Sequence, residues 1–125
     1  MSTPITRTQV PEGVRDRLPG EAARVRRLSD QLDGVFRTWG YREVATPVIE
    51  YLEAVSVGAG NWGRPEDLYQ LFDRKGRTLA LRPDMTTPIA RLAATRLGGE
   101  NLPLRLAYFA PVFRHRDLRA GAASE

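Results

Sequence analysis

The segment Leu79 to Arg91, LALRPDMTTPIAR, changes its periodicity halfway along. Its first four residues alternate in the manner of a strand. Pro83 ends that strand, because proline has no backbone N–H to give to a sheet. Apolar residues then recur at helical spacing, at Ile89, Leu92, Ala93 and Leu97. The segment therefore predicts a strand that turns directly into a helix, so the fold must combine both kinds of element.

The corner between this strand and this helix is charged and hydroxylated. Asp84 offers a carboxylate and Thr86 a hydroxyl, which together can bind the ammonium group of a small ligand. The alternative is that Asp84, Thr86 and Thr87 only cap a helix whose first residue is Pro88. Residue types alone favour capping, because that is what Asp and Thr usually do in front of a helix.

A long amphipathic helix is predicted from Glu21 to Trp39. Its apolar residues fall on one stripe: Val25, Leu28, Leu32, Val35, Phe36 and Trp39. Leu18-Pro19-Gly20 is expected to exclude helix before Glu21, and Gly40 is placed to end it. Gly34 weakens the helix by about 1 kcal/mol relative to alanine without interrupting the stripe. The stripe predicts a helix packed on a sheet.

The next segment is extended. Tyr41 to Tyr51 reads as a strand that Pro47 interrupts, which implies a sheet edge or a bend. Leu52 to Val57 is predicted as a short helix. Gly58 to Asp67 is predicted as a loop, because it contains three glycines and a proline.

A β-hairpin precedes the corner. Leu68 to Phe72 and Arg77 to Leu81 are its predicted strands, joined by a turn over residues 73–76. After the corner, the helix is expected to end at Gly98-Gly99, and Leu104 to Val112 reads as a last strand. The order of elements predicts an α+β fold, with a mainly antiparallel sheet flanked by helices.

Composition narrows the possible functions. Hydrophobic content of 42% and charged content of 27% are those of a globular protein. The chain has no cysteine and one histidine, His115, so we expect neither disulfides nor a metal site. No apolar run approaches the roughly 20 residues that span a membrane, and a cytoplasmic protein is expected. The net charge is +4, but the arginines are scattered among acids, which favours a solvated surface over a nucleic-acid site.

Four segments in fixed order resemble one family. They are PEGVRDRLP, WGYREVATPVIEY, FDRKGRTLALRPDMTTPIAR and LAYFAPVFRHR. Together they resemble the class II aminoacyl-tRNA synthetase catalytic fold, in particular histidyl-tRNA synthetase and its non-catalytic relative, the regulatory subunit of ATP phosphoribosyltransferase. The long helix with Thr46-Pro47 is similar to the first class II motif, which builds the homodimer interface. Ala107 to Arg116 is similar to the opening strand of the second motif.

Two departures favour the non-catalytic relative. The synthetase pattern has Arg-Pro-Glu-Gly-Thr at the corner, where Glu and Thr hold the α-amino group of histidine, and this chain has Asp84-Met85-Thr86. The pattern also has a glutamate two places after the arginine of its second motif, where it contacts the adenine of ATP. Arg114 stands at the arginine position, and Arg116 stands at the glutamate position. Because a cation cannot accept the adenine amino hydrogens, the pattern argues against activation of histidine by ATP.

The resemblance implies a regulatory function. The expected protein is a non-catalytic subunit that activates the short-form ATP phosphoribosyltransferase catalytic subunit, a glycosyltransferase, in the first step of histidine biosynthesis. It is expected to form a homodimer, to need no cofactor, and to bind free histidine through Asp84, Thr86 and Arg114. The alternatives are histidyl-tRNA synthetase, an aminoacyl-tRNA ligase, and a synthetase-like binding module with another partner. Without the resemblance, the residue type of Arg114 favours a surface arginine paired with a neighbouring acid. No partnership with tRNA is expected.

The polar, aperiodic start of the sequence and the resemblance together predict the domain organisation. Residues 1–10 are expected to form a flexible N-terminal arm. Residues 11–125 are expected to form the N-terminal part of a class II synthetase-like domain, interrupted within the second motif.

Overall fold

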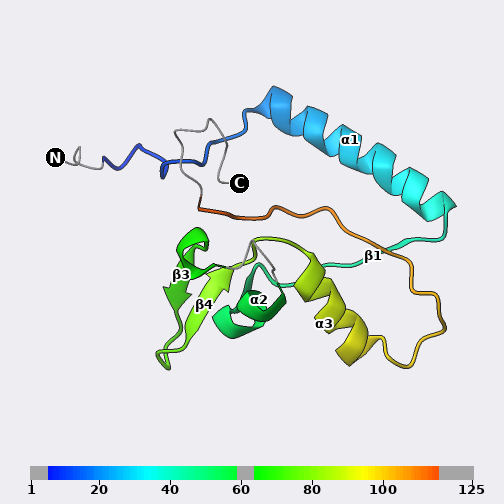
Figure 1. Ribbon diagram of the computed structural model, residues 1–125. Coiled ribbons are helices and arrows are strands. Elements are labelled where there is room, and N and C mark those ends of the chain that lie inside the picture. The colour runs from blue at the N-terminus through cyan, green and yellow to red at the C-terminus, as the bar shows by residue number, and fades with distance from the viewer. Residues whose placement is uncertain (1–5, 59–63, 116–125) are drawn as a thin grey trace.

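The computed structural model describes residues 6–58 and 64–115 (Figure 1). Its elements follow one another as α1 (Pro19–Thr38), β1 (Arg42–Glu43), β2 (Ile49–Tyr51), α2 (Leu52–Gly58), the 3-10 helix η2 (Pro65–Asp67), β3 (Gln70–Phe72), β4 (Thr78–Leu81), α3 (Thr86–Arg96) and β5 (Leu106–Ala107). No helix in these two ranges is long and apolar enough to cross a membrane.

The strands form two small sheets. The first has the order β2-β4-β3 and is antiparallel throughout, with Glu50 opposite Ala80 and Leu71 opposite Leu79. The second pairs β1 with β5 in parallel, although the two strands lie far apart in the sequence. The expected α+β fold with a mainly antiparallel sheet is confirmed, and the parallel pair is its exception.

The core lies between α2 and the three-stranded sheet. Three residues are buried together: Val55 of α2, Ala80 of β4, and Leu68, which precedes β3. Leu52 packs against them. Ala80 is fully buried, whereas Leu79 and Leu81 on the other face of β4 are half-buried. The face of β4 that carries the smaller residue therefore faces the helices, and α3 packs beside α2 on the same body.

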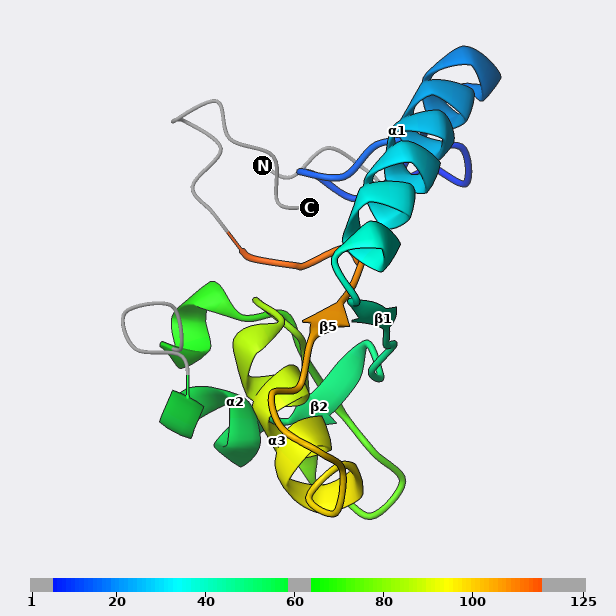
Figure 2. The same cartoon turned by 90° about the vertical axis from the view of Figure 1, so that its right-hand side faces the viewer.

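Helix α1 lies apart from this body, beyond the β1–β5 pair (Figures 1 and 2). It has no buried residue. Phe36 connects it to the rest of the chain, with its ring 5.7 Å from that of Tyr41 and 5.9 Å from that of Phe109. The predicted packing of the apolar stripe on a sheet is therefore absent from the described residues, apart from Phe36.

The end of α1 is a Schellman motif. The Gly40 amide donates to the Arg37 carbonyl at 3.0 Å, and the Tyr41 amide donates to the Phe36 carbonyl at 3.0 Å. Gly40 has φ +75°, which glycine adopts without the steric cost of a side chain. The apolar contact of Phe36 with Tyr41 completes the motif. The prediction that Gly40 ends the helix is confirmed.

Several predicted boundaries are wrong. Helix α1 begins at Pro19, because a proline fits the first turn, where its missing N–H has no helical partner. Helix α3 begins at Thr86, two residues before the predicted start at Pro88, and its last residue, Arg96, lies just before the predicted stop at Gly98-Gly99. Residues 65–67 form η2 inside the predicted loop.

The predicted last strand is also shorter than expected. Of Leu104 to Val112, only Leu106–Ala107 pairs as strand β5. The chain beyond it is held by single hydrogen bonds, from the Phe113 amide to the Arg82 carbonyl and from the His115 amide to the Asp67 carbonyl.

Candidate functional site

The predicted corner is where β4 ends and α3 begins. Leu81 is the last residue of β4 and Thr86 the first of α3. Pro83 between them is buried, and Met85 is only 4% exposed. The Met85 side chain therefore enters the interior at the start of the helix and anchors the backbone of the corner.

Asp84 and Thr86 are brought together at this corner. The Asp84 Oδ1 atom accepts a hydrogen bond of 2.9 Å from the Thr86 backbone amide. This contact satisfies one of the free amides in the first turn of α3, although the N-cap position is Met85 and Asp84 lies one residue before it. No described residue donates to Asp84 Oδ2, and Thr86 is exposed. One carboxylate oxygen therefore serves the helix, while the other is available to a ligand.

Arg114 reaches the same corner from a distant segment. Its Nε atom donates to the carbonyl of Pro83 at 2.8 Å. The side chain is half-buried, so it lies against the corner and does not extend into solvent. The three predicted site residues are thus gathered around Pro83, with a carboxylate and a hydroxyl from one segment and a guanidinium from another. Such a set matches the two charges of an amino acid, an ammonium and a carboxylate.

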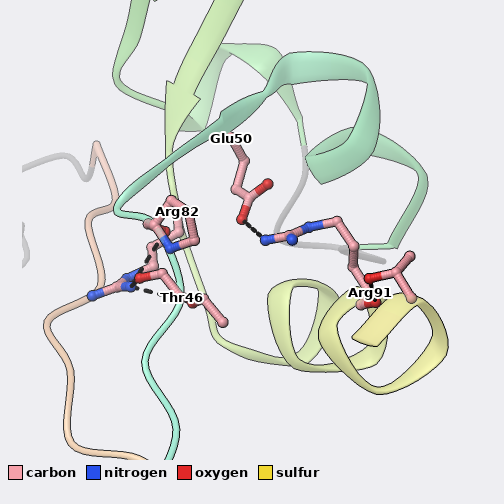
Figure 3. A network of polar contacts seen from close by, with 6 residues as sticks. Thr46, Glu50, Arg82 and Arg91 are labelled. Carbon is pink, nitrogen blue, oxygen red and sulfur yellow. Dashed lines mark hydrogen bonds and ion pairs between the residues drawn. The ribbon is translucent and has the colours of Figure 1, made fainter. Parts of the chain in front are cut away.

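Sequence reasoning missed Arg82 as a site residue. Its side chain is buried at 4% exposure and donates from Nε to the Pro111 carbonyl at 3.0 Å. Its Nη1 donates to the carbonyls of Thr46 at 2.9 Å and Pro47 at 3.3 Å (Figure 3). The only local signal was the alternation of the strand, which places Arg82 on the same face as Ala80 and on the opposite face from Leu81. Nothing in the sequence identified that face as the buried one.

An ion pair fixes α3 against the sheet beneath the corner. Arg91 of α3 and Glu50 of β2 point toward one another, with Nη2 2.5 Å from Oε1 (Figure 3). The Glu50 side chain is 10% exposed, so this pair is better shielded from water than the other ion pairs in the two described ranges.

Other parts of the described chain offer fewer groups that could bind a ligand or a metal. A cavity of about 500 Å³ lies along α1, lined by residues such as Val25, Asp33 and Phe109, and it includes none of the three predicted site residues. No group of three metal-ligating side chains is found among residues 6–58 and 64–115. His115 is exposed, with its ring 5.4 Å from that of Tyr69. Arg116 lies outside the described residues.

Comparison with known proteins identifies similar chains. The family profile described as histidyl-tRNA synthetase matches residues 13–125. A curated ATP phosphoribosyltransferase regulatory subunit from Symbiobacterium thermophilum is 82% identical over 100% of this chain and 31% of its own length. The one from Moorella thermoacetica is 50% identical over 94% of this chain and 30% of its own length.

Solved structures that are similar to this chain carry the same two names. A crystal structure of an ATP phosphoribosyltransferase regulatory subunit/histidyl-tRNA synthetase from Bacillus halodurans has a TM-score of 0.84 at 38% identity, covering 97% of this chain and 31% of that one. Apo histidyl-tRNA synthetase from S. aureus has a TM-score of 0.72 at 28% identity, covering 85% and 29%. The expected class II synthetase-like fold is confirmed, and the chain spans less than a third of the length of these relatives.

Proposed function

Because the chain belongs to the histidyl-tRNA synthetase family, we propose that the full-length protein is a non-catalytic regulatory subunit of ATP phosphoribosyltransferase. The observation that carries the proposal is the 82% identity, over the whole chain, to a protein of that name. The proposed partner is the short-form catalytic subunit, which condenses ATP with phosphoribosyl pyrophosphate in the first step of histidine biosynthesis. These reactants are cytoplasmic metabolites, so the proposal includes a cytoplasmic location.

The proposed effector is free histidine, bound at the corner. Asp84 and Thr86 would take its α-ammonium, and Arg114 its carboxylate. The side chain contacts around Pro83 support this assignment, because they gather both charges within one small region. Histidine then regulates the complex only if it binds one conformation better than another, and that difference in affinity is the coupling free energy.

The assay that tests the function measures phosphoribosyl-ATP formation by the short-form catalytic subunit, alone and with the full-length protein. We expect activity to rise with the added subunit and to saturate at a fixed molar ratio. Histidine titrated into the complex is expected to change that activity. No change in rate at any ratio, with both proteins folded, would overturn the proposal.

The second candidate is histidyl-tRNA synthetase, which the retained carboxylate and hydroxyl of the corner favour. Met85 argues against it, because its buried side chain occupies a position where the synthetase pattern has glycine. Exchange of labelled pyrophosphate into ATP, dependent on histidine, separates the two functions. We expect none above background, and clear exchange would establish the synthetase.

A further inference from the structure

Arg82 carries a charge in the interior of the protein with only neutral partners. Every acceptor that the described residues supply to its guanidinium is a carbonyl or hydroxyl oxygen, from Thr46, Pro47 and Pro111. A buried cation is unfavourable unless its donors are satisfied. The position therefore depends on the geometry of these hydrogen bonds, and no described residue forms an ion pair with it.

These bonds join three separate segments. Arg82 itself ends the hairpin at the corner, Thr46 and Pro47 connect β1 to β2, and Pro111 belongs to the chain after β5 (Figures 1 and 3). The backbone of Arg82 forms hydrogen bonds with the same two neighbouring segments. Its amide donates to the Val48 carbonyl at 3.0 Å, and its carbonyl accepts from the Phe113 amide at 2.9 Å.

The segment that Arg82 holds is the one that carries Arg114. Pro111 is bound by the Arg82 side chain, Phe113 by the Arg82 carbonyl, and Arg114 by the neighbouring Pro83 carbonyl. No regular strand pairing fixes this stretch, because β5 ends at Ala107. The position of the Arg114 guanidinium relative to Asp84 therefore depends on these contacts.

We infer that Arg82 is the positioning residue of the corner site: its guanidinium holds the segment 109–115, and with it Arg114, in register with Asp84 and Thr86. The inference rests on the proposed histidine site. Arginine suits this role because its planar fork presents donors in two directions at once, whereas lysine is a point charge on a flexible stem.

The experiment compares two equivalent substitutions in the full-length protein. Arg82→Lys keeps the charge and loses the fork. Arg91→Lys makes the same change nearby, in a pair that binds α3 to β2 and does not touch the segment 109–115. Amide hydrogen exchange at Phe113 reports the hold on the segment without any ligand. Calorimetric titration of histidine reports the site.

We expect Arg82→Lys to speed exchange at Phe113 and to weaken histidine binding, each by roughly tenfold or more, because small displacements of a binding group are costly. Arg91→Lys is expected to leave both within twofold. Unchanged exchange in Arg82→Lys, unchanged affinity despite faster exchange, or equal effects of the two substitutions would each overturn the inference. If the unsubstituted protein binds no histidine, the effector site falls and the inference with it, while exchange still tells whether Arg82 holds the segment.

A measurement on the unsubstituted protein covers the case in which Arg82→Lys does not fold. The Nε–H of Arg82 is expected to exchange with solvent at least tenfold more slowly than that of Arg91, whose side chain is 40% exposed. Equal rates for the two guanidinium groups would overturn the inference.

Discussion

The two carboxylate oxygens of Asp84 have different surroundings, and this difference makes charge separable from capping. Oδ1 accepts from the Thr86 amide, a bond that the amide oxygen of asparagine can also accept. A ligand ammonium needs the negative charge as well, and such a charge-assisted bond is worth about 1.5 to 3 kcal/mol.

Asp84→Asn is therefore expected to weaken histidine binding by roughly tenfold or more while the melting temperature stays close to that of the unsubstituted protein. Calorimetric titration and a thermal melt of the full-length protein measure both quantities. Asp73→Asn is the control for histidine affinity, which it is expected to leave unchanged, since Asp73 also accepts backbone amides but lies at the hairpin turn. Unchanged affinity in Asp84→Asn would leave Asp84 as a cap alone.

Asp73 gives the hairpin a dependence on pH. The pKa of Asp73 is lowered, because its carboxylate accepts hydrogen bonds from three groups. In order of decreasing effect they are the Arg77 amide, the Arg77 guanidinium and the Lys75 amide. Because the folded pKa lies below the unfolded one, the stabilisation is fully present above about pH 4. It is lost as the pH falls through the folded pKa.

An NMR titration of the Asp73 carboxyl carbon is expected to give a midpoint below that of an ordinary aspartate. Asp73→Asn is expected to lower stability at neutral pH and to remove this part of the acid sensitivity, which thermal melts across the acidic range would show. A midpoint at the ordinary value would contradict the hydrogen bonding described for the turn.

At the scale of elements, the same substitution is expected to have opposite effects at two glycines, one inside α1 and one just after its end. Gly34 is inside the helix with nothing within 4 Å of an added Cβ, whereas Gly40 has φ +75°. Gly34→Ala is expected to stabilise the protein by about 0.5 to 1 kcal/mol, and Gly40→Ala to destabilise it by about 1 to 2 kcal/mol. Urea denaturation of each variant measures the change, and equal signs would contradict the helix end described here.

Elements with a local signal were predictable, and contacts between distant segments were not. The stripe of α1, the hairpin around Asp73 and the stop at Gly40 follow from periodicity and turn chemistry, which neighbouring residues determine. The parallel pairing of β1 with β5 depends on segments far apart, so no local pattern indicates it. For the same reason, the family resemblance predicted Asp84, Thr86 and Arg114 as one histidine site, but no local pattern showed that the Pro83 carbonyl holds Arg114 at the corner.

At the scale of the whole molecule, the apolar face of α1 is exposed in the part of the chain that the structure describes. Val25, Leu28, Leu32 and Val35 are 40%, 57%, 42% and 54% exposed. Apolar stripes of this kind are typical of interfaces. The homodimer through α1 and the region around Pro47 remains a prediction from the resemblance to the first class II motif.

Light scattering of the full-length protein at micromolar concentration is expected to give the mass of a dimer. Leu32→Asp, on the stripe, is expected to reduce that mass to the monomer's, because a charge cannot be buried there without a partner. Ala23→Asp adds the same charge on the opposite side of α1 and is expected to leave the dimer intact. A monomer without any substitution, or equal masses for the two variants, would contradict the predicted surface.

The hydrogen bonds of Arg82 also bear on how this family changes over evolutionary time. Apart from the Thr46 hydroxyl, its acceptors are main-chain carbonyls, which every amino acid possesses. Residues at positions 46, 47 and 111 can therefore be exchanged without removing their acceptor atoms. An alignment of relatives is expected to show position 82 held as arginine with no compensating exchanges at the other three positions. Methods that infer contacts from paired exchanges would overlook this junction, because the information is carried by one side chain alone.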